Sequence, residues 1–80
     1  MKTIIVDDEI MAIKLVRNYL ERDKHVEIVG ECLDAGEALQ CVRERAVEAA
    51  FLDICIHGCM DGVELGKKLK EINPQIVLIY

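Results

Sequence analysis

The sequence predicts an α/β domain in which helices cover both faces of a parallel sheet. Short apolar runs alternate with longer segments whose apolar residues recur at helical spacing. The connections between them are short, and such alternation produces right-handed crossovers and parallel strands. Acidic residues follow two of the apolar runs, as expected where a buried strand ends. Eighty residues are enough for one domain of this kind.

The first part of the chain predicts a strand, a helix and a second strand. The first strand is expected over Lys2–Val6 and the helix over Glu9–Arg22. An acidic start favours the positive end of the helix dipole. The second strand is expected over Val26–Glu31, interrupted partway by Gly30. The apolar positions of the helix are Ile10, Ile13, Val16 and Leu20.

The middle of the chain predicts a second helix and a third strand. Asp34 supplies an acceptor at the helix start, and Glu37 stands three residues later, as in a capping box. The helix is expected to end near Arg45, and the strand to cover Ala49–Ile54. The inward positions of the helix are expected to be Ala38, Leu39, Val42 and Ala46.

The last part predicts a third helix and a fourth strand. Asp61-Gly62 opens the helix, and Asn73-Pro74 ends it because the residue before proline disfavours helical backbone. The fourth strand is expected over Gln75–Tyr80. The core positions of this helix are expected to be Val63, Leu65, Leu69 and Ile72.

Three aspartates are the strongest functional signal. Four strands in the order 2-1-3-4 make the start of a flavodoxin-like sheet, in which strands one and three are neighbours. Asp7, Asp8 and Asp53 then meet at the carboxyl ends of these strands, where ligands of open α/β sheets bind. Three carboxylates repel one another unless a cation or a proton relieves them. The sequence therefore predicts an acidic, metal-binding pocket.

Composition limits the classes of partner and compartment. Ten basic and fifteen acidic residues give a net charge of −5, which argues against nucleic-acid binding by this segment. This charge is compatible with a DNA-binding domain elsewhere in a longer parent protein. No apolar run is long enough for a membrane span, so we expect no membrane partner and a cytoplasmic location. The cysteines should then stay reduced, with Cys32 and Cys41 as small buried side chains.

Several blocks resemble, in order and spacing, the receiver domain of bacterial two-component response regulators. The similarity runs over all eighty residues. The blocks are Ile4-Ile5-Val6-Asp7-Asp8-Glu9, Val29-Gly30-Glu31, Gly36-Glu37-Ala38-Leu39, Phe51-Leu52-Asp53-Ile54, Met60-Asp61-Gly62-Val63-Glu64-Leu65 and Ile72-Asn73-Pro74-Gln75-Ile76.

The resemblance implies a phosphoacceptor module that is not itself an enzyme. Asp53 would accept a phosphoryl group from a histidine kinase. Asp8 and Asp53 would bind Mg²⁺ directly, Asp7 would hold it through water, and Cys55 would contribute its backbone carbonyl. Mg²⁺ suits this chemistry because it neutralises charge on the transferring group.

The chain departs from the family pattern in two places. The loop after Asp53 lacks the usual proline, and Asp61 lies eight residues on instead of seven. Residues 1–80 also correspond to a partial receiver domain, before the family's fifth strand, its last two helices, a phosphate-contacting hydroxyl residue and a lysine. We therefore expect weaker phosphorylation. We also expect a homodimer through the exposed edge of the fourth strand.

The sequence is compatible with two other interpretations. The chain could keep the receiver fold without lasting phosphorylation and act as an assembly or interaction module. Cys55, His57 and Cys59, with Asp61, could imitate a zinc site, but structural zinc ligands seldom alternate this tightly on a loop.

Overall fold

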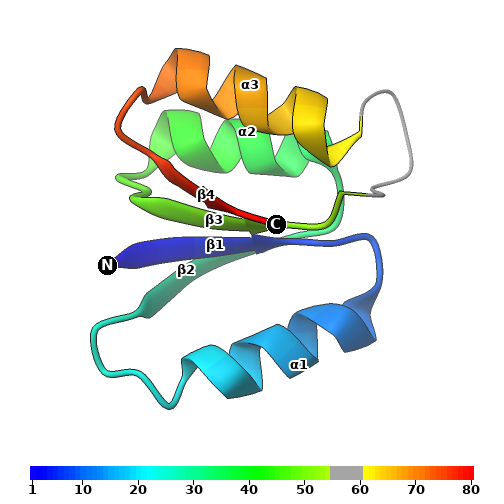
Figure 1. Ribbon diagram of the computed structural model, residues 1–80, viewed down its shortest axis with the longest axis vertical. Coiled ribbons are helices and arrows are strands. Elements are labelled where there is room, and N and C mark those ends of the chain that lie inside the picture. Colours follow the sequence, from blue (N-terminus) through cyan, green and yellow to red (C-terminus); the bar gives the residue numbers. More distant parts are fainter. Residues whose placement is uncertain (55–60) are drawn as a thin grey trace.

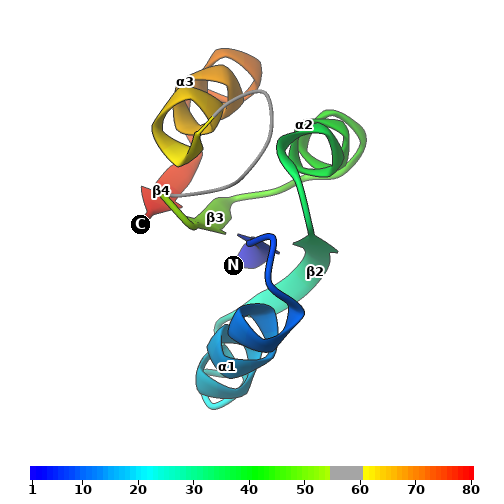
Figure 2. The ribbon, with the colours of Figure 1, turned by 90° about the vertical axis from the view of Figure 1, so that its right-hand side faces the viewer.

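A four-stranded sheet lies between one helix on one face and two helices on the other (Figures 1 and 2). The computed structural model describes residues 1–54 and 61–80. The elements are β1 (Lys2–Val6), α1 (Ile10–Leu20), β2 (Glu27–Cys32), α2 (Ala35–Glu44), β3 (Ala49–Leu52), α3 (Gly62–Ile72) and β4 (Val77–Ile79).

The order of the strands is β2-β1-β3-β4, and every pair is parallel. This confirms the predicted doubly wound, flavodoxin-like arrangement. Val6 at the end of β1 lies opposite Cys32 of β2 and Leu52 of β3. The strands β2, β1 and β3 therefore end side by side. A register shift between Thr3 and Ile4 of β1 interrupts only the pairing with β2.

The core consists of two apolar layers separated by the sheet. The smaller layer, under α1, contains Ile5, Ile13 and Leu20. The larger layer lies on the side of the sheet that α2 and α3 cover (Figure 2). Its fully buried side chains include Ile4, Val6, Leu65, Leu69 and Ile76.

Aspartate side chains cap the N-termini of two helices, α2 and α3. Asp34 accepts a hydrogen bond from the backbone amide of Glu37 at 2.8 Å, and Asp61 accepts one from the amide of Glu64 at 2.9 Å. Each bond satisfies an amide that the first helical turn leaves without a partner. The Glu37 side chain reaches back to the amide of Leu33 at 3.1 Å, so the reciprocal cap predicted for α2 is present in a slightly extended form.

Several helices and strands are shorter than predicted. The helix predicted over Glu9–Arg22 is Ile10–Leu20, and the strand predicted over Ala49–Ile54 ends at Leu52. The latter ends early because its neighbour β1 ends at Val6, opposite Leu52. The fourth strand is limited to Val77–Ile79 and pairs with β3 alone.

Three predicted core positions are exposed: Ile10, Ala46 and Val63. The buried stripe of α3 instead follows Gly62, Leu65, Gly66 and Leu69. Val63 is the next residue round the helix from this stripe, so its side chain is 44% exposed. Ala46 lies beyond the end of α2, and Val47 takes the buried position there.

The two described cysteines, Cys32 and Cys41, are free thiols. Cys32 is buried and Cys41 is half-buried. Burial raises the pKa of the Cys32 thiol to about 12, and the nearby Cys41 adds to the effect. Among the described residues, no helix is long and apolar enough to cross a membrane.

Candidate functional site

The ends of β1 and β3 bring the three predicted aspartates together. The backbone amide of Asp7 donates to the carbonyl of Cys32 at 3.0 Å, which ties the residue after β1 to the end of β2. The amide of Asp53 donates to the carbonyl of Val6 at 3.1 Å, which ties the residue after β3 to the end of β1. Parallel pairing thus extends one step beyond the strands and fixes the backbone that carries both carboxylates.

The carboxylates of Asp7, Asp8 and Asp53 form one acidic cluster. One ligand oxygen from each lies within 4.8 Å of the other two, and all three residues are half-buried. Two unit charges 4 Å apart repel by about 1 kcal/mol in water and about 4 kcal/mol near a protein surface. Such repulsion is large beside the total stability of a small domain. A cation bound among the three carboxylates would relieve this repulsion.

Asp7 responds most clearly to this environment. Burial raises the pKa of the Asp7 carboxyl above its usual 3.8, and the charges of Asp53 and Asp8 raise it further. A hydrogen bond from the backbone amide of Glu9 to Asp7 Oδ1, 2.9 Å long, lowers the pKa and offsets part of the rise. The remaining excess of negative charge is what a bound cation would neutralise.

An apolar hollow of about 220 Å³ borders the cluster. Asp7 and Asp53 line it together with Val16 of α1, Phe51 of β3 and Tyr80. Asp7 thus lies beside apolar side chains, which agrees with the burial that raises its pKa. Sequence reasoning did not identify Val16, Phe51 or Tyr80 as neighbours of the site, because their proximity depends on the packing of α1 and β4 around the sheet.

The donor set fits a hard divalent cation. Carboxylate oxygens are the ligands that Mg²⁺ prefers, at distances of about 2.0–2.1 Å. Two oxygens on opposite sides of one Mg²⁺ would then be about 4 Å apart. The observed spread of 4.8 Å is close to that value, so small side-chain adjustments would bring the three carboxylates around one ion.

The remaining predicted metal ligands are Cys55 and the residues of the zinc interpretation. Cys55, the expected carbonyl ligand, lies outside the described residues, as do His57 and Cys59 of the zinc interpretation. Asp61 is described, and its side chain caps α3. Among the described residues, the three aspartates are the one group of three or more acidic, histidine or cysteine side chains close enough to share a metal ion.

The chain is similar in sequence to a transcriptional regulatory protein and to a sensory transduction protein. The transcriptional regulatory protein BtsR of Escherichia coli K12 is 36% identical over 80 residues, which cover 99% of this chain and 33% of BtsR. The sensory transduction protein LytT of Bacillus cereus is 34% identical over 79 residues, which cover 98% of this chain and 32% of LytT. The chain thus spans about a third of the length of these curated relatives.

Solved structures share the same fold over nearly the whole chain. The isolated REC domain of RcsB from Salmonella enterica serovar Typhimurium, solved in the presence of the phosphomimetic BeF₃⁻, has a TM-score of 0.90 and 26% identity. The match covers 98% of this chain and 58% of that one. The signal receiver domain of a modulated diguanylate cyclase from Desulfovibrio desulfuricans G20 has a TM-score of 0.84 and 29% identity, and the match covers 98% and 62% of the two chains.

The family assignment rests on the match over the whole fold. Residues 3–80 match the response regulator receiver domain family. The acidic cluster, the parallel sheet order and the similarity to solved receiver domains all agree with that match. This chain therefore belongs to the response regulator receiver domain family of two-component signalling.

Proposed function

We propose that this chain is a phosphoacceptor module in which Asp53 receives a phosphoryl group from a histidine kinase, with Mg²⁺ bound at the acidic cluster. The observation that carries the proposal is the gathering of the Asp7, Asp8 and Asp53 oxygens within 4.8 Å of one another. In this role the chain is a substrate of the kinase and not an enzyme. Because such kinases take their phosphoryl group from ATP, the proposed compartment is the cytoplasm.

The proposed transfer makes and breaks one bond to phosphorus. A carboxylate oxygen of Asp53 attacks the phosphorus of the kinase phosphohistidine and forms an aspartyl phosphate. The bond between phosphorus and the imidazole nitrogen breaks, and its electron pair stays on that nitrogen, which takes up a proton. Asp53 suits the role of nucleophile because its backbone is held by the hydrogen bond to Val6, which keeps the carboxylate positioned at the strand end.

Asp7 and Asp8 would hold the metal ion beside the nucleophile. Bound Mg²⁺ supplies positive charge that neutralises the phosphoryl oxygens during transfer. The amide of Glu9 keeps the Asp7 carboxylate in place through its 2.9 Å hydrogen bond. Val16, Phe51 and Tyr80 line the apolar hollow beside the two carboxylates.

Phosphorylation by a small phosphodonor tests the proposal without requiring the partner kinase. The 80-residue chain is incubated with acetyl phosphate and Mg²⁺, and its intact mass is measured. The expected result is one added phosphoryl group that depends on Mg²⁺ and is absent from Asp53→Asn. Asp23→Asn is the matched control, because Asp23 lies in the turn before β2, at the opposite end of the sheet from the cluster.

The acetyl phosphate and Mg²⁺ conditions are first shown to phosphorylate a complete receiver domain, so that a negative result on this chain can be interpreted. No added phosphate on this chain, under conditions that modify that receiver, would contradict the proposal. The same mass increase in Asp53→Asn would also contradict it, since the phosphate would then be on another residue.

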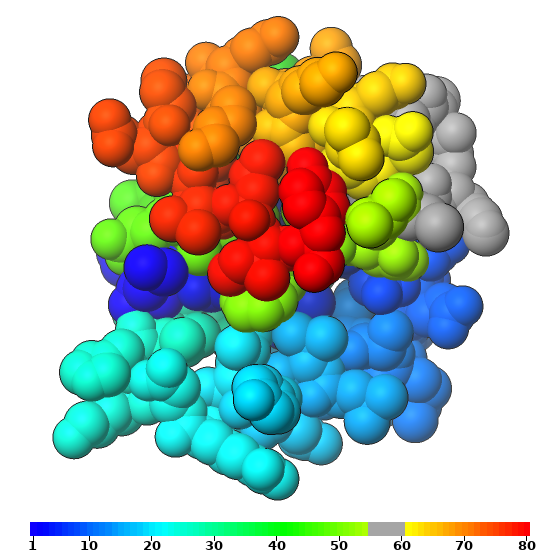
Figure 3. Space-filling view, in the orientation of Figure 1, coloured from blue at the N-terminus to red at the C-terminus, as the bar shows by residue number. Residues whose placement is uncertain are grey.

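A second function is favoured by the surface around β4. Val77 and Tyr80 are 46% and 54% exposed, and β4 is an edge strand of the described sheet. Figure 3 shows this end of the chain, in red, uncovered on one face of the molecule. The opposite edge strand, β2, carries charged Glu27 and Glu31, which discourage pairing. We propose that the 80-residue chain self-associates through β4.

The size of the particle in solution tests this second function. Sedimentation equilibrium at micromolar concentration is expected to show a dimer or larger assembly, and Ile79→Lys is expected to shift it towards monomer. Glu27→Lys, on the opposite edge strand, is the matched control and should leave the assembly unchanged. A compact monomer for the unmodified chain would contradict the proposal.

A further inference from the structure

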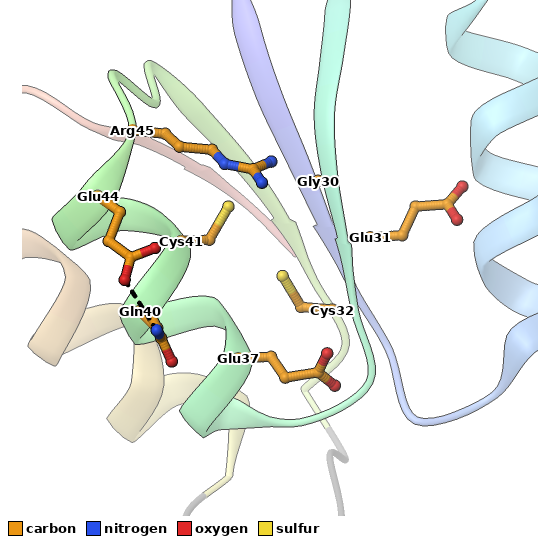
Figure 4. A pocket seen from close by; sticks show the side chains of 8 residues that line it. All are labelled: Gly30, Glu31, Cys32, Glu37, Gln40, Cys41, Glu44 and Arg45. Carbon is orange, nitrogen blue, oxygen red and sulfur yellow. Dashed lines mark hydrogen bonds between the residues drawn. The ribbon is translucent and has the colours of Figure 1, made fainter.

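Two free cysteines project into the space between β2 and α2. Cys32 is the last residue of β2, and Cys41 is on α2, nine positions later in the chain. Figure 4 shows their side chains entering the same space from opposite sides, Cys32 from the strand and Cys41 from the helix. Both line a cavity of about 310 Å³ and both contact the larger apolar layer.

Gly30 allows the thiol of Cys41 to approach the strand closely. A Cβ atom at Gly30 would lie 2.9 Å from Cys41 Sγ, closer than real Cβ atoms approach a neighbour. Gly30 and Cys32 are two residues apart on β2, so their side-chain positions share one face of the strand. Cys41 Sγ therefore packs against Gly30, which is the neighbour of Cys32 on that face of β2.

The two thiols differ in their access to solvent. Cys32 is 3% exposed, whereas Cys41 is half-buried and lines the open cavity. A small reagent that enters this cavity therefore reaches Cys41 first. The cavity also contains more acidic than basic groups, which favours a cationic reagent. Glu37, Glu44 and Arg45 carry these charges, whereas the Glu31 side chain points away from the cavity and pairs with Arg17 of α1.

We propose that Cys32 and Cys41 are a redox modification site that closes to an intramolecular disulfide when a small cationic disulfide enters the cavity. A disulfide needs its sulfur atoms about 2.0 Å apart and its Cβ atoms about 4 Å apart. Side-chain rotation sets the positions of the two sulfur atoms, whereas the Cβ separation is set by the backbones of β2 and α2, which face each other across this cavity. This cysteine site does not involve Asp7, Asp8 or Asp53, so it is independent of the proposed phosphorylation.

The reaction takes place in two exchange steps. The Cys41 thiolate attacks one sulfur of the reagent, forms a mixed disulfide and releases the first small thiolate. The Cys32 thiolate then attacks the Cys41 sulfur, forms the Cys32–Cys41 bond and releases the second small thiolate. Two protein thiols are oxidised and one reagent disulfide is reduced, and the two thiol protons pass to the released thiolates. The raised pKa of Cys32 keeps its thiolate scarce, so the second step depends on the high effective concentration of an intramolecular reaction.

Peptide mapping of the intact chain after treatment with cystamine tests the proposal. Free thiols are then alkylated and the chain is digested with trypsin, which leaves both cysteines in the peptide His25–Arg43 and places Cys55 and Cys59 in a different peptide. The expected product is His25–Arg43 without alkyl groups and lighter by two hydrogens. A peptide that carries two alkyl groups, or two added cysteamines, would overturn the proposal.

Single substitutions test the order of the two steps. Cys32→Ser is expected to stop at the mixed disulfide on Cys41, because the second thiol is absent. Cys41→Ser is expected to leave Cys32 at least tenfold slower to react than Cys41 is in Cys32→Ser. The difference should disappear in denaturant, where both thiols are accessible. Equal rates for the two folded variants would overturn the assignment of Cys41 as the entry point.

Discussion

The backbone amide of Asp53 donates to the carbonyl of Val6 across 3.1 Å, one step beyond the last paired residues of β1 and β3. This bond makes the residue after β3 a neighbour of the residue after β1. Because it involves only backbone atoms, replacing the Asp53 side chain leaves it intact. The carboxylates of the acidic cluster can therefore be changed one at a time without removing the scaffold that positions them.

Asp7→Asn should make the folded chain more stable at neutral pH. The pKa of Asp7 is raised in the fold, mainly by burial, so ionising this group costs more in the folded than in the unfolded state. Stability should therefore fall as pH rises from about 3.8 through the folded pKa, and stay lower above it. Asparagine removes this loss and can still accept the hydrogen bond from Glu9.

Urea denaturation at neutral pH and below pH 3.8 checks this prediction. The midpoint of Asp7→Asn should exceed that of the unmodified chain at neutral pH only. Asp23→Asn is the matched control, because Asp23 makes the same type of hydrogen bond, to the amide of His25 at 2.9 Å, on an exposed turn. A neutral-pH gain of equal size in both variants would show that the acidic cluster is not its source.

Gly62→Ala should destabilise the fold by about 1–3 kcal/mol, although alanine is the better helix former. A Cβ at Gly62 would lie 2.2 Å from the backbone oxygen of Asp53 and 2.9 Å from Cα of Ile54. Both are backbone atoms, so no side-chain rotation relieves the contact. The start of α3 is also tied to this segment by a hydrogen bond from the Gly62 amide to the Ile54 carbonyl, 3.0 Å long.

Gly36→Ala provides the comparison. A Cβ there would meet its nearest neighbour, Asp34 Oδ1, at 3.4 Å, so alanine is expected to be neutral or to stabilise α2 by up to about 1 kcal/mol. Thermal denaturation of the two variants measures the difference. If both alanines shifted the melting temperature by the same amount, the close approach of α3 to Asp53 would not be a constraint on the fold.

Asp61→Ala should cost about 1 kcal/mol, because the Asp61 side chain caps α3 by accepting from the amide of Glu64. In a domain of this size that loss lowers the melting temperature by roughly 4–8 °C. Lys68→Ala, an exposed change on the same helix, is the control and should have little effect. If Asp61 were instead a ligand of structural zinc, a chelator would destabilise the unmodified chain and spare Asp61→Ala.

Much of the fold followed from the sequence because the apolar patterns are local and regular. The bounds of β1 and α3 were predicted closely, and the strand order followed from the alternation of strands and helices. The positions of Asp7 and Asp53 followed in turn, since the carboxyl ends of neighbouring parallel strands lie together.

Other features depend on contacts between distant segments and could not be read from local patterns. The spacing of Val63 suits a core position, but α3 turns its glycine-containing stripe to the sheet, and Val63 is exposed. The apolar hollow beside the cluster requires Tyr80 to lie near Asp7. The shared cavity of Cys32 and Cys41 likewise requires α2 to rest against Gly30.

The most direct test of the account is the location of a bound divalent cation. Mn²⁺ shares the preference of Mg²⁺ for oxygen ligands and broadens the NMR signals of nearby amides. Substoichiometric Mn²⁺ is expected to broaden the amides of Asp7, Asp8 and Asp53 first. Excess Mg²⁺ should reverse the effect, and Asp8→Asn should weaken it at least tenfold. Broadening spread over the acidic surface, or unchanged in Asp8→Asn, would contradict a single cation site at the ends of β1 and β3.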